Sequence, residues 1–259
     1  RIKYIMAYTV INKSTTNFNT KPYTGNGGTQ TISGVGFQPN LIITKGRDLG
    51  ESPWWTDTVL GLTKYRYSNG AATDQTYTNA VTGTNSDGYA LGNYNGFNNN
   101  TKKFVSWNWK ANNYGTGYGD NNTNGSINSN TSANTTAGFS IIKYTGNGTN
   151  HATIGHGLNS APSMFITKRL NAGDDWIVSH HKMHSTPWDD NYCTLNTSVA
   201  RSGAKSTTGG TAPTSSLIYL GNDSVVNASG STYVTYAFTD IQGYSKAGGY
   251  TGNNSAGGS

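Results

Sequence analysis

The stretch "IIKYTGNGTN", residues 141–150, decides the fold because it joins strand-like residues to a polar turn. Related phrases occur twice more, as "TKPYTGNGGTQ" at residues 20–30 and as "GGYTGNNSAGG" at residues 248–258. Glycine and asparagine tolerate the positive φ angles of tight turns, so Thr-Gly-Asn-Gly is expected to end one strand and lead into the next. A glycine-rich loop that cradles phosphate would instead be followed by a helix, and strand-like residues follow here.

The similarity between the first two phrases continues along the chain. "TISGVGFQPNLIITKGR" at residues 31–47 matches "ATIGHGLNSAPSMFITKR" at residues 152–169, with two extra residues before the second proline. Further on, "FVSWNW" at residues 104–109 corresponds to "YVTYAF" at residues 233–238. The alternation in both hexapeptides predicts strands with one buried face. The chain therefore contains two copies of one β-rich unit.

The repeats divide the chain into five segments. We expect the terminal strand of a preceding repeat in residues 1–20, a first repeat in 21–112, a linker in 113–124, a second repeat in 125–240 and the start of a following repeat in 241–259. Partial repeats at both ends predict a longer tandem array, or an exchange of terminal strands with neighbouring subunits. They also predict self-association, because incomplete repeats leave sheet edges unpaired.

The composition favours strands over helices. Of 259 residues, 34 are glycine, 12% are aromatic and only 12% are charged, so strong helix formers are scarce. Threonine, valine, isoleucine, tyrosine and tryptophan suit pleated sheets, while glycine and asparagine suit turns. An all-β, antiparallel fold is therefore predicted. The single cysteine, Cys193, excludes an internal disulfide and a cysteine-based zinc site.

The charge distribution does not indicate a nucleic-acid partner. The formal net charge is +6, but the 18 lysines and arginines are scattered along the chain rather than gathered in a basic run. Proteins that grip nucleic acid concentrate such residues on one face, so we expect no nucleic-acid binding. No stretch is long and apolar enough for a membrane span, so no membrane insertion is expected.

Several segments resemble a domain that occurs in tandem in tail-fibre and other structural proteins of bacteriophages, many of them marine. They are "FSIIKYTGNGTNHATIGHGLNSAPSMFITKR" (139–169), "DDWIVSHH" (174–181), "TAPTSSLIYLG" (211–221) and "VNASGSTYVTYAFTDIQGYSKAGGYTGN" (226–253). The resemblance implies tandem jelly-roll β-sandwiches of a concanavalin-like or laminin-G-like kind, on a virion or similar extracellular surface. It supplies no binding residue to carry over.

Together these observations predict a non-enzymatic virion structural protein, such as a tail fibre, spike or surface decoration. Its expected partners are other copies of itself, neighbouring virion proteins and host-surface polysaccharide. The alternatives are a purely architectural coat or fibre protein and a glycan-cleaving enzyme. Cleavage needs two carboxylates facing each other across a sugar, and the adjacent pairs Asp174–Asp175 and Asp189–Asp190 are poorly suited to that geometry. No Gly-x-Ser-x-Gly elbow occurs, and no catalytic residue is assigned.

Adhesion to glycan would need exposed aromatic rings, because their faces stack on the apolar faces of sugars. Trp54 and Trp55 are adjacent, so on a strand they point to opposite faces and one is a candidate for exposure. With Trp188 and the nearby carboxylates, the carbohydrate-binding candidates are Trp54, Trp55, Asp57, Trp188, Asp189 and Asp190. The competing interpretation is burial of these tryptophans at repeat or subunit contacts. Trp107, Trp109 and Trp176 lie in alternating patterns and are expected to face sandwich cores.

The histidine cluster has the residue types of a metal site but not the local structure. His180 and His184 have the i, i+4 spacing that helices use for zinc, and His181 and Cys193 lie nearby. The local pattern predicts a strand that leads into a loop, so no metal ligand is assigned and no cofactor is expected. Calcium stays open as an alternative through the acidic pairs, because laminin-G-like folds sometimes hold it at their rim, but no recognisable calcium loop supports it.

Overall fold

The protein is almost entirely β. The computed structural model describes residues 11–112 and 119–253, with 38% of residues in strands and 5% in helices. The strands form several antiparallel sheets, so the predicted all-β class is confirmed. Among the described residues, no helix is long and apolar enough to span a bilayer.

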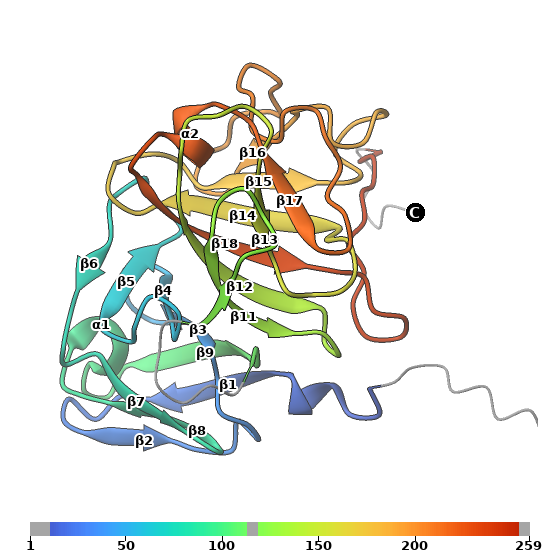
Figure 1. The fold of residues 1–259 in the computed structure, drawn as a ribbon. Coiled ribbons are helices and arrows are strands. Elements are labelled where there is room, and N and C mark those ends of the chain that lie inside the picture. The colour runs from blue at the N-terminus through green and yellow to red at the C-terminus, as the bar shows by residue number, and fades with distance from the viewer. Residues whose placement is uncertain (1–10, 113–118, 254–259) are drawn as a thin grey trace, which may run out of the picture.

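The first repeat consists of a large sheet, a small sheet and two short helical turns (Figure 1). In spatial order, the large sheet contains β1 (Phe18–Thr24), β9 (Lys103–Trp109), β3 (Leu41–Gly46), β4 (Trp54–Asp57), β5 (Lys64–Tyr67) and β6 (Gln75–Thr76). The small sheet contains β2 (Gln30–Ile32), β8 (Gly88–Leu91) and β7 (Val81–Asn85). The helical turns are η1 (Ser14–Thr16) and α1 (Asn95–Asn98).

The second repeat has the same central strand order. Its large sheet contains β10 (Asp120–Asn122), β11 (Ser129–Asn134), β12 (Phe139–Thr145), β18 (Thr232–Phe238), β14 (Met164–Arg169), β15 (Ile177–His180) and β16 (Cys193–Thr194). Its small sheet and helix are β13 (Ala152–Gly155), β17 (Leu217–Leu220) and α2 (Ser224–Asn227). The order β12-β18-β14-β15 reproduces β1-β9-β3-β4, so the sequence repeat is also a repeat of topology.

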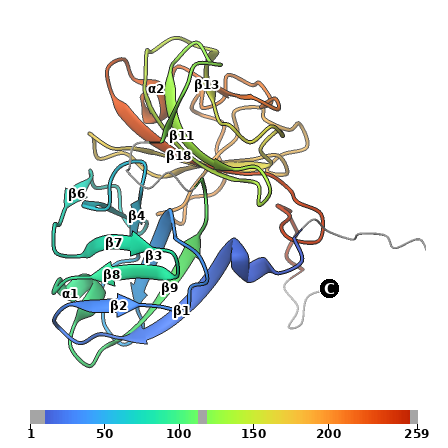
Figure 2. The same cartoon turned by 60° about the horizontal axis from the view of Figure 1, so that its bottom comes forward.

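The two large sheets face each other, and the small sheets lie outside them. On β3 and β4, Ile42 and Trp54 belong to the core between the large and small sheets of the first repeat. Their neighbours Ile43 and Trp55 point the other way and pack against the second repeat, for example against Tyr236. The result is four stacked layers with an apolar core between each adjacent pair, and a smaller cluster around Ile177 and Val225 lies in the second repeat. Figure 2 shows β2, β8 and β7 over β3 and β9. We call the contact between the large sheets the seam.

Strand β9 has one fully buried face and one partly buried face, and its tryptophans lie on the partly buried face. Trp107 and Trp109 pack against the seam rather than into the core of their own repeat. The opposite face carries Phe104, Ser106 and Asn108, all fully buried. Asn108 is accommodated because its side-chain amide donates to Asn19 O (3.1 Å) and to Ser106 Oγ (3.0 Å). Alternation identified the strand correctly, but the more apolar face turned out to meet the other repeat.

The repeated Thr-Gly-Asn-Gly phrase forms the predicted turn after β1 and after β12. Gly27 and Gly148 have φ angles of 71° and 74°, which favour glycine. In the first repeat, the N–H of Gly27 donates to Asn98 O, and the N–H of Asn26 donates to Asn98 Oδ1, both at 2.8 Å. Asn98 is the last residue of α1 and is fully buried.

Asn227 of α2 plays the same part in the second repeat. It accepts from the N–H of Gly148 (2.8 Å) through its carbonyl and from the N–H of Asn147 (2.9 Å) through Oδ1. A Cβ at Gly146 would lie 2.5 Å from Ala228 O, so the glycine lets the turn approach the helix. The phrase recurs because it docks the equivalent strands β1 and β12 each onto a buried asparagine. The third copy includes Tyr250, which is 97% exposed.

The predicted segment boundaries meet the structure as follows. Of the segment 1–20, predicted to hold a terminal strand, residues 1–10 lie outside the described residues, as do 113–118 of the predicted linker. Residues 14–16 form η1, and residues 18–20 begin β1 of the first repeat. The rest of that linker contains β10, which pairs with β11 and extends the second large sheet. Residues 241–253, expected to begin a following repeat, contain no strand and form one bridge between Ile241 and Ser245.

The sheet edges are poor templates for uncontrolled pairing. Edge strand β1 carries Lys21 and Pro22, and edge strands β6 and β16 have two residues each. Lysine, proline and short length are the features that natural sheets use to blunt their edges. Self-association through these edge strands therefore stays a prediction, and the length and composition of the strands do not support it.

We expect Asn227→Ala to lower the free energy of unfolding by about 2–4 kcal/mol. The substitution leaves the N–H of Asn147 and the carbonyls of Thr149 and Gly221 without their side-chain partner. Urea unfolding followed by tryptophan fluorescence measures the loss. The exposed neighbour in Asn222→Ala is the control and should change stability by less than about 0.5 kcal/mol. Equal effects of the two substitutions would refute the docking role of Asn227.

Candidate functional site

The three candidate tryptophans are buried. Their exposed fractions are 6% for Trp54, 7% for Trp55 and 9% for Trp188. Trp54 meets Tyr67 edge-on at 5.3 Å, and Trp188 stacks on Phe165 at 5.4 Å with an interplanar angle of 6°. These rings offer no open face to a sugar.

The expectation that one ring of the Trp54–Trp55 pair is exposed is therefore corrected. The two rings do point to opposite faces of β4, but each face is covered. The small sheet of the first repeat covers Trp54, and the second repeat covers Trp55 through Trp176 (5.1 Å) and Tyr236 (5.2 Å). Trp55 thus lies at a repeat contact, as the architectural interpretation expects.

The candidate carboxylates near Trp188 organise their own loop. Asp190 Oδ1 accepts from the N–H groups of Thr207 (2.9 Å) and Thr208 (2.6 Å). Asp189 accepts from the side chain of Asn191 (2.5 Å) and contacts His184. Both carboxylates are half-buried and already have hydrogen-bond partners, so their positions give no direct support to sugar binding.

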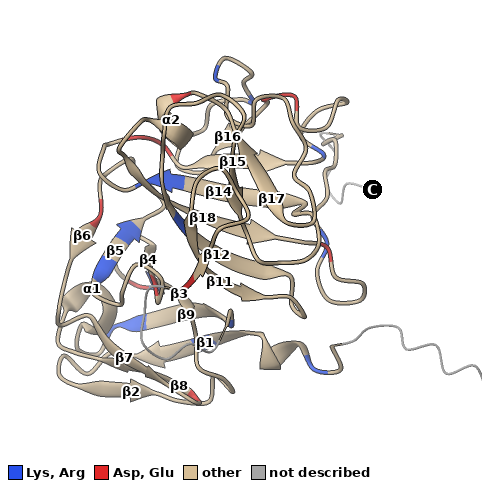
Figure 3. Cartoon of the chain, viewed as in Figure 1, with Lys and Arg blue, Asp and Glu red and all other residues tan. Residues whose placement is uncertain are grey.

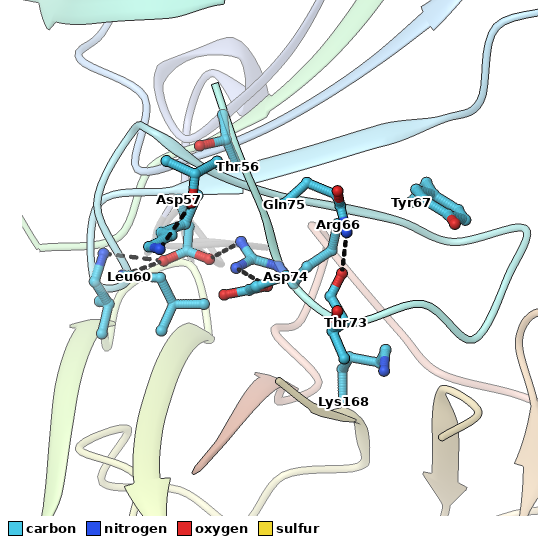
Figure 4. Close-up of polar contacts among 12 residues, drawn as sticks. Thr56, Asp57, Leu60, Arg66, Tyr67, Thr73, Asp74, Gln75 and Lys168 are labelled. Atoms are coloured by element: carbon cyan, nitrogen blue, oxygen red, sulfur yellow. Dashed lines mark hydrogen bonds and ion pairs between the residues drawn. The ribbon is translucent and has the colours of Figure 1, made fainter. Parts of the chain in front are cut away.

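Asp57 is the centre of a buried polar network at the seam (Figure 4). Its Oδ1 accepts from the N–H groups of Val59 (3.0 Å) and Leu60 (2.8 Å). Its Oδ2 accepts from Arg66 Nη2 (2.6 Å) and from the hydroxyl of Tyr236 (2.8 Å), which belongs to β18 of the second repeat. The carboxylate therefore joins both repeats through four donors.

This network offsets the cost of removing charge from water. Asp57, Arg66 and Tyr236 have side chains that are essentially inaccessible to solvent, and burial of an ion pair is favourable only when the remaining polar atoms find partners. Arg66 has a second carboxylate partner in Asp74 at 3.3 Å. Burial raises the pKa of Tyr236 well above its usual value, so its hydroxyl stays a donor. Sequence reasoning missed this network because Tyr236 lies 179 residues from Asp57, and no local pattern pairs Asp57 with Arg66.

Lys168 provides another polar link across the seam. Its ammonium group donates to Arg169 O (2.7 Å), Ala71 O (3.2 Å) and Ala172 O (3.4 Å), and Ala71 belongs to the first repeat. Lys45, its equivalent in the first repeat, similarly donates to the carbonyls one and four residues ahead. Burial lowers the pKa of Lys168 to about 8. Figure 3 shows that the other lysines and arginines are spread over both repeats.

A groove opens at one edge of the seam and is a candidate binding site because aromatic side chains of both repeats line it. Its volume is about 300 Å³. It is lined by Ser14, Asn17, Phe18, Trp109, Ala137, Phe139, Phe238, Tyr244 and Ser245. Phe18 pairs with Trp109 across β1 and β9, and Phe139 pairs with Phe238 across β12 and β18. These pairs occupy equivalent places in the two repeats, and this equivalence is the signal in the sequence that could have found them.

A second hollow of about 390 Å³ adjoins the groove, since Phe238 and Ser245 line both. Its polar side chains include His180, Asp240 and Lys246. The neighbouring ring of His181 contacts Ala247 O at 3.2 Å. Within residues 11–112 and 119–253, no group of three or more histidine, cysteine or acidic side chains is arranged to hold a metal ion.

Comparison with known families identifies the family to which the chain belongs. Residues 13–259 match the model of a family described as a domain of unknown function (DUF7483). The chain belongs to this family. No curated protein and no solved structure shows a significant match. The family match runs across both repeats, so the unit that the DUF7483 model describes includes the seam and the groove.

Replacing Asp57 should be among the most damaging single changes. We expect Asp57→Ala to reduce the free energy of unfolding by about 3–5 kcal/mol, because it leaves the charge of Arg66 buried beside fewer partners. Tyr236→Phe removes only one donor and should cost about 1–2 kcal/mol. Chemical denaturation measures both, with the exposed Asp120→Ala as control. A loss below about 1 kcal/mol for Asp57→Ala would show that the network is dispensable.

Stability should increase from pH 8 toward pH 10 through Lys168. Its folded-state pKa is about 8, below the ordinary value of 10.5, so between these values the unfolded chain binds the proton more strongly. Raising the pH therefore favours the folded state, by up to about 1.4 kcal/mol per pH unit. The difference in unfolding free energy between wild type and Lys168→Met should grow across this range. A constant difference would contradict the lowered pKa.

Proposed function

We propose that this chain is a non-enzymatic structural module, a two-repeat block of a virion fibre, spike or surface decoration or of a comparable extracellular assembly. The observation that carries the proposal is the seam. A large apolar surface and a buried polar network join the repeats, so they form one body rather than two separate domains. Such a body can transmit force and hold a fixed shape.

The use of the tryptophans supports this role. Trp55 and Trp176 pack against each other across the seam, and Trp107 and Trp109 pack against the same cluster. Aromatic side chains bury large apolar areas, and their commitment to internal contacts favours architecture over adhesion by these residues. The pairing of a large sheet with a small sheet in each repeat is compatible with a concanavalin-like or laminin-G-like jelly roll, which we retain as part of the proposal.

The best-connected carboxylates also fit a structural role. Asp57 is enclosed by four donors, Asp190 holds a loop, and Asp87 accepts from the N–H groups of Gly34 and Gly36, both at 2.8 Å. A carboxyl group of a glycosidase must instead be free to exchange protons with a sugar. These contacts therefore favour a stabilising role for the carboxylates over a role in glycan cleavage.

A rigid two-repeat block should unfold in one transition. Scanning calorimetry should give a calorimetric enthalpy equal to the van't Hoff enthalpy, because neither repeat keeps its seam face buried alone. Two separate transitions would refute the rigid block.

Incubation of the chain with a polysaccharide panel should release no new reducing ends. Release that tracks the purified chain and disappears in an acidic-residue variant would establish an enzyme instead.

A further inference from the structure

We propose that the groove at the edge of the seam binds a neutral oligosaccharide, with Trp109, Phe238 and Tyr244 as its main contacts. This goes beyond the proposed structural role, which needs no ligand. It also moves the sugar site from the buried tryptophans to residues that remain partly exposed.

The groove is a product of the assembled pair. Phe18 and Trp109 of the first repeat lie with their ring centroids 4.7 Å apart, and Phe139 and Phe238 of the second repeat lie 5.1 Å apart. Trp109 also approaches Phe139 across the seam at 6.2 Å. The floor is therefore a continuous aromatic surface, and its shape depends on the fixed position of one repeat against the other.

The polar groups of the lining are few, and two of them are uncommitted. Asn17 is occupied, since its Oδ1 accepts from the side chain of Asn134 (3.0 Å) and its Nδ2 donates to Thr16 (3.2 Å). Within the described chain, the hydroxyls of Ser14 and Tyr244 have no hydrogen-bond partner. Burial raises the pKa of Tyr244, so this hydroxyl is protonated and able to donate.

These features select the chemistry of the ligand. The groove contains five aromatic rings and no charged side chain, so it offers no counter-charge to an acidic or basic ligand. Binding pockets commonly combine an apolar wall with a few polar groups that fix orientation. A pyranose ring matches this wall because it has an apolar C–H face for the aromatic rings and hydroxyls for Ser14 and Tyr244. A lipid chain would leave both hydroxyls without a partner.

The adjoining hollow argues for a chain of sugars rather than one. It shares Phe238 and Ser245 with the groove and adds the polar side chains of His180, Asp240 and Lys246. A sugar that stacks in the groove would place the next units over these donors and acceptors. Affinity is therefore expected to increase from the monosaccharide to the tetrasaccharide.

The test is titration of the full chain with neutral homo-oligosaccharides of increasing length, built from glucose, mannose, xylose or N-acetylglucosamine. Calorimetry gives the affinity, and tryptophan fluorescence reports on Trp109. Tyr244→Ala should weaken binding about tenfold, and Tyr244→Phe should have a smaller effect because only the hydroxyl is lost. Tyr250→Ala is the matched control, since Tyr250 is exposed and lies outside the groove.

The proposal is overturned if no neutral saccharide binds at millimolar concentration, or if binding survives both Tyr244→Ala and Trp109→Phe with affinity unchanged. Binding restricted to acidic polysaccharides, or to indole and phenol in place of sugars, would overturn the ligand class. Unfolding curves of each variant establish that the fold is intact. Loss of the sugar result would leave the structural proposal standing, because that proposal depends on the single unfolding transition.

Discussion

The carboxylate of Asp57 imposes the constraint on which the rest of the structure depends. A charge removed from water must find donors, and here four donors come from three places: the turn after β4, Arg66 on β5, and Tyr236 on β18 of the other repeat. They converge only when both repeats are folded and aligned. The ion pair thus determines how the two repeats are aligned more than it adds net stability. The apolar contacts around it supply the free energy that holds the repeats together.

A seam of this kind fixes the position of one repeat relative to the other. In a string of independent domains the linker decides the geometry, whereas here the faces of two large sheets decide it. The aromatic pairs at the strand ends meet only because the sheets are held in one position. A surface that neither repeat possesses alone is formed at their junction, so architecture and binding are compatible outcomes of the same packing.

The sequence predicted the repeats, the strands and the turn phrase because these depend on local patterns of two to ten residues. It did not predict which layer each face meets. Trp54 and Trp55 illustrate the limit, since two adjacent aromatics show that both faces of β4 are apolar but cannot name what covers them. Tyr236 lies 179 residues from Asp57, and no local pattern connects them. Long-range partners of buried polar groups are set by tertiary packing alone.

Differences between the two repeats at the seam favour the pairing of the first repeat with the second. Strand register makes His180 the equivalent of Asp57, and Trp107 the equivalent of Tyr236. Two first repeats packed together would set a bulkier indole where Asp57 needs a hydroxyl, and two second repeats would contain no buried carboxylate to satisfy. Only the unlike pair satisfies the network, so the same polar group that couples the repeats also selects between them. Divergence of the two copies is therefore part of the mechanism that holds them in one arrangement.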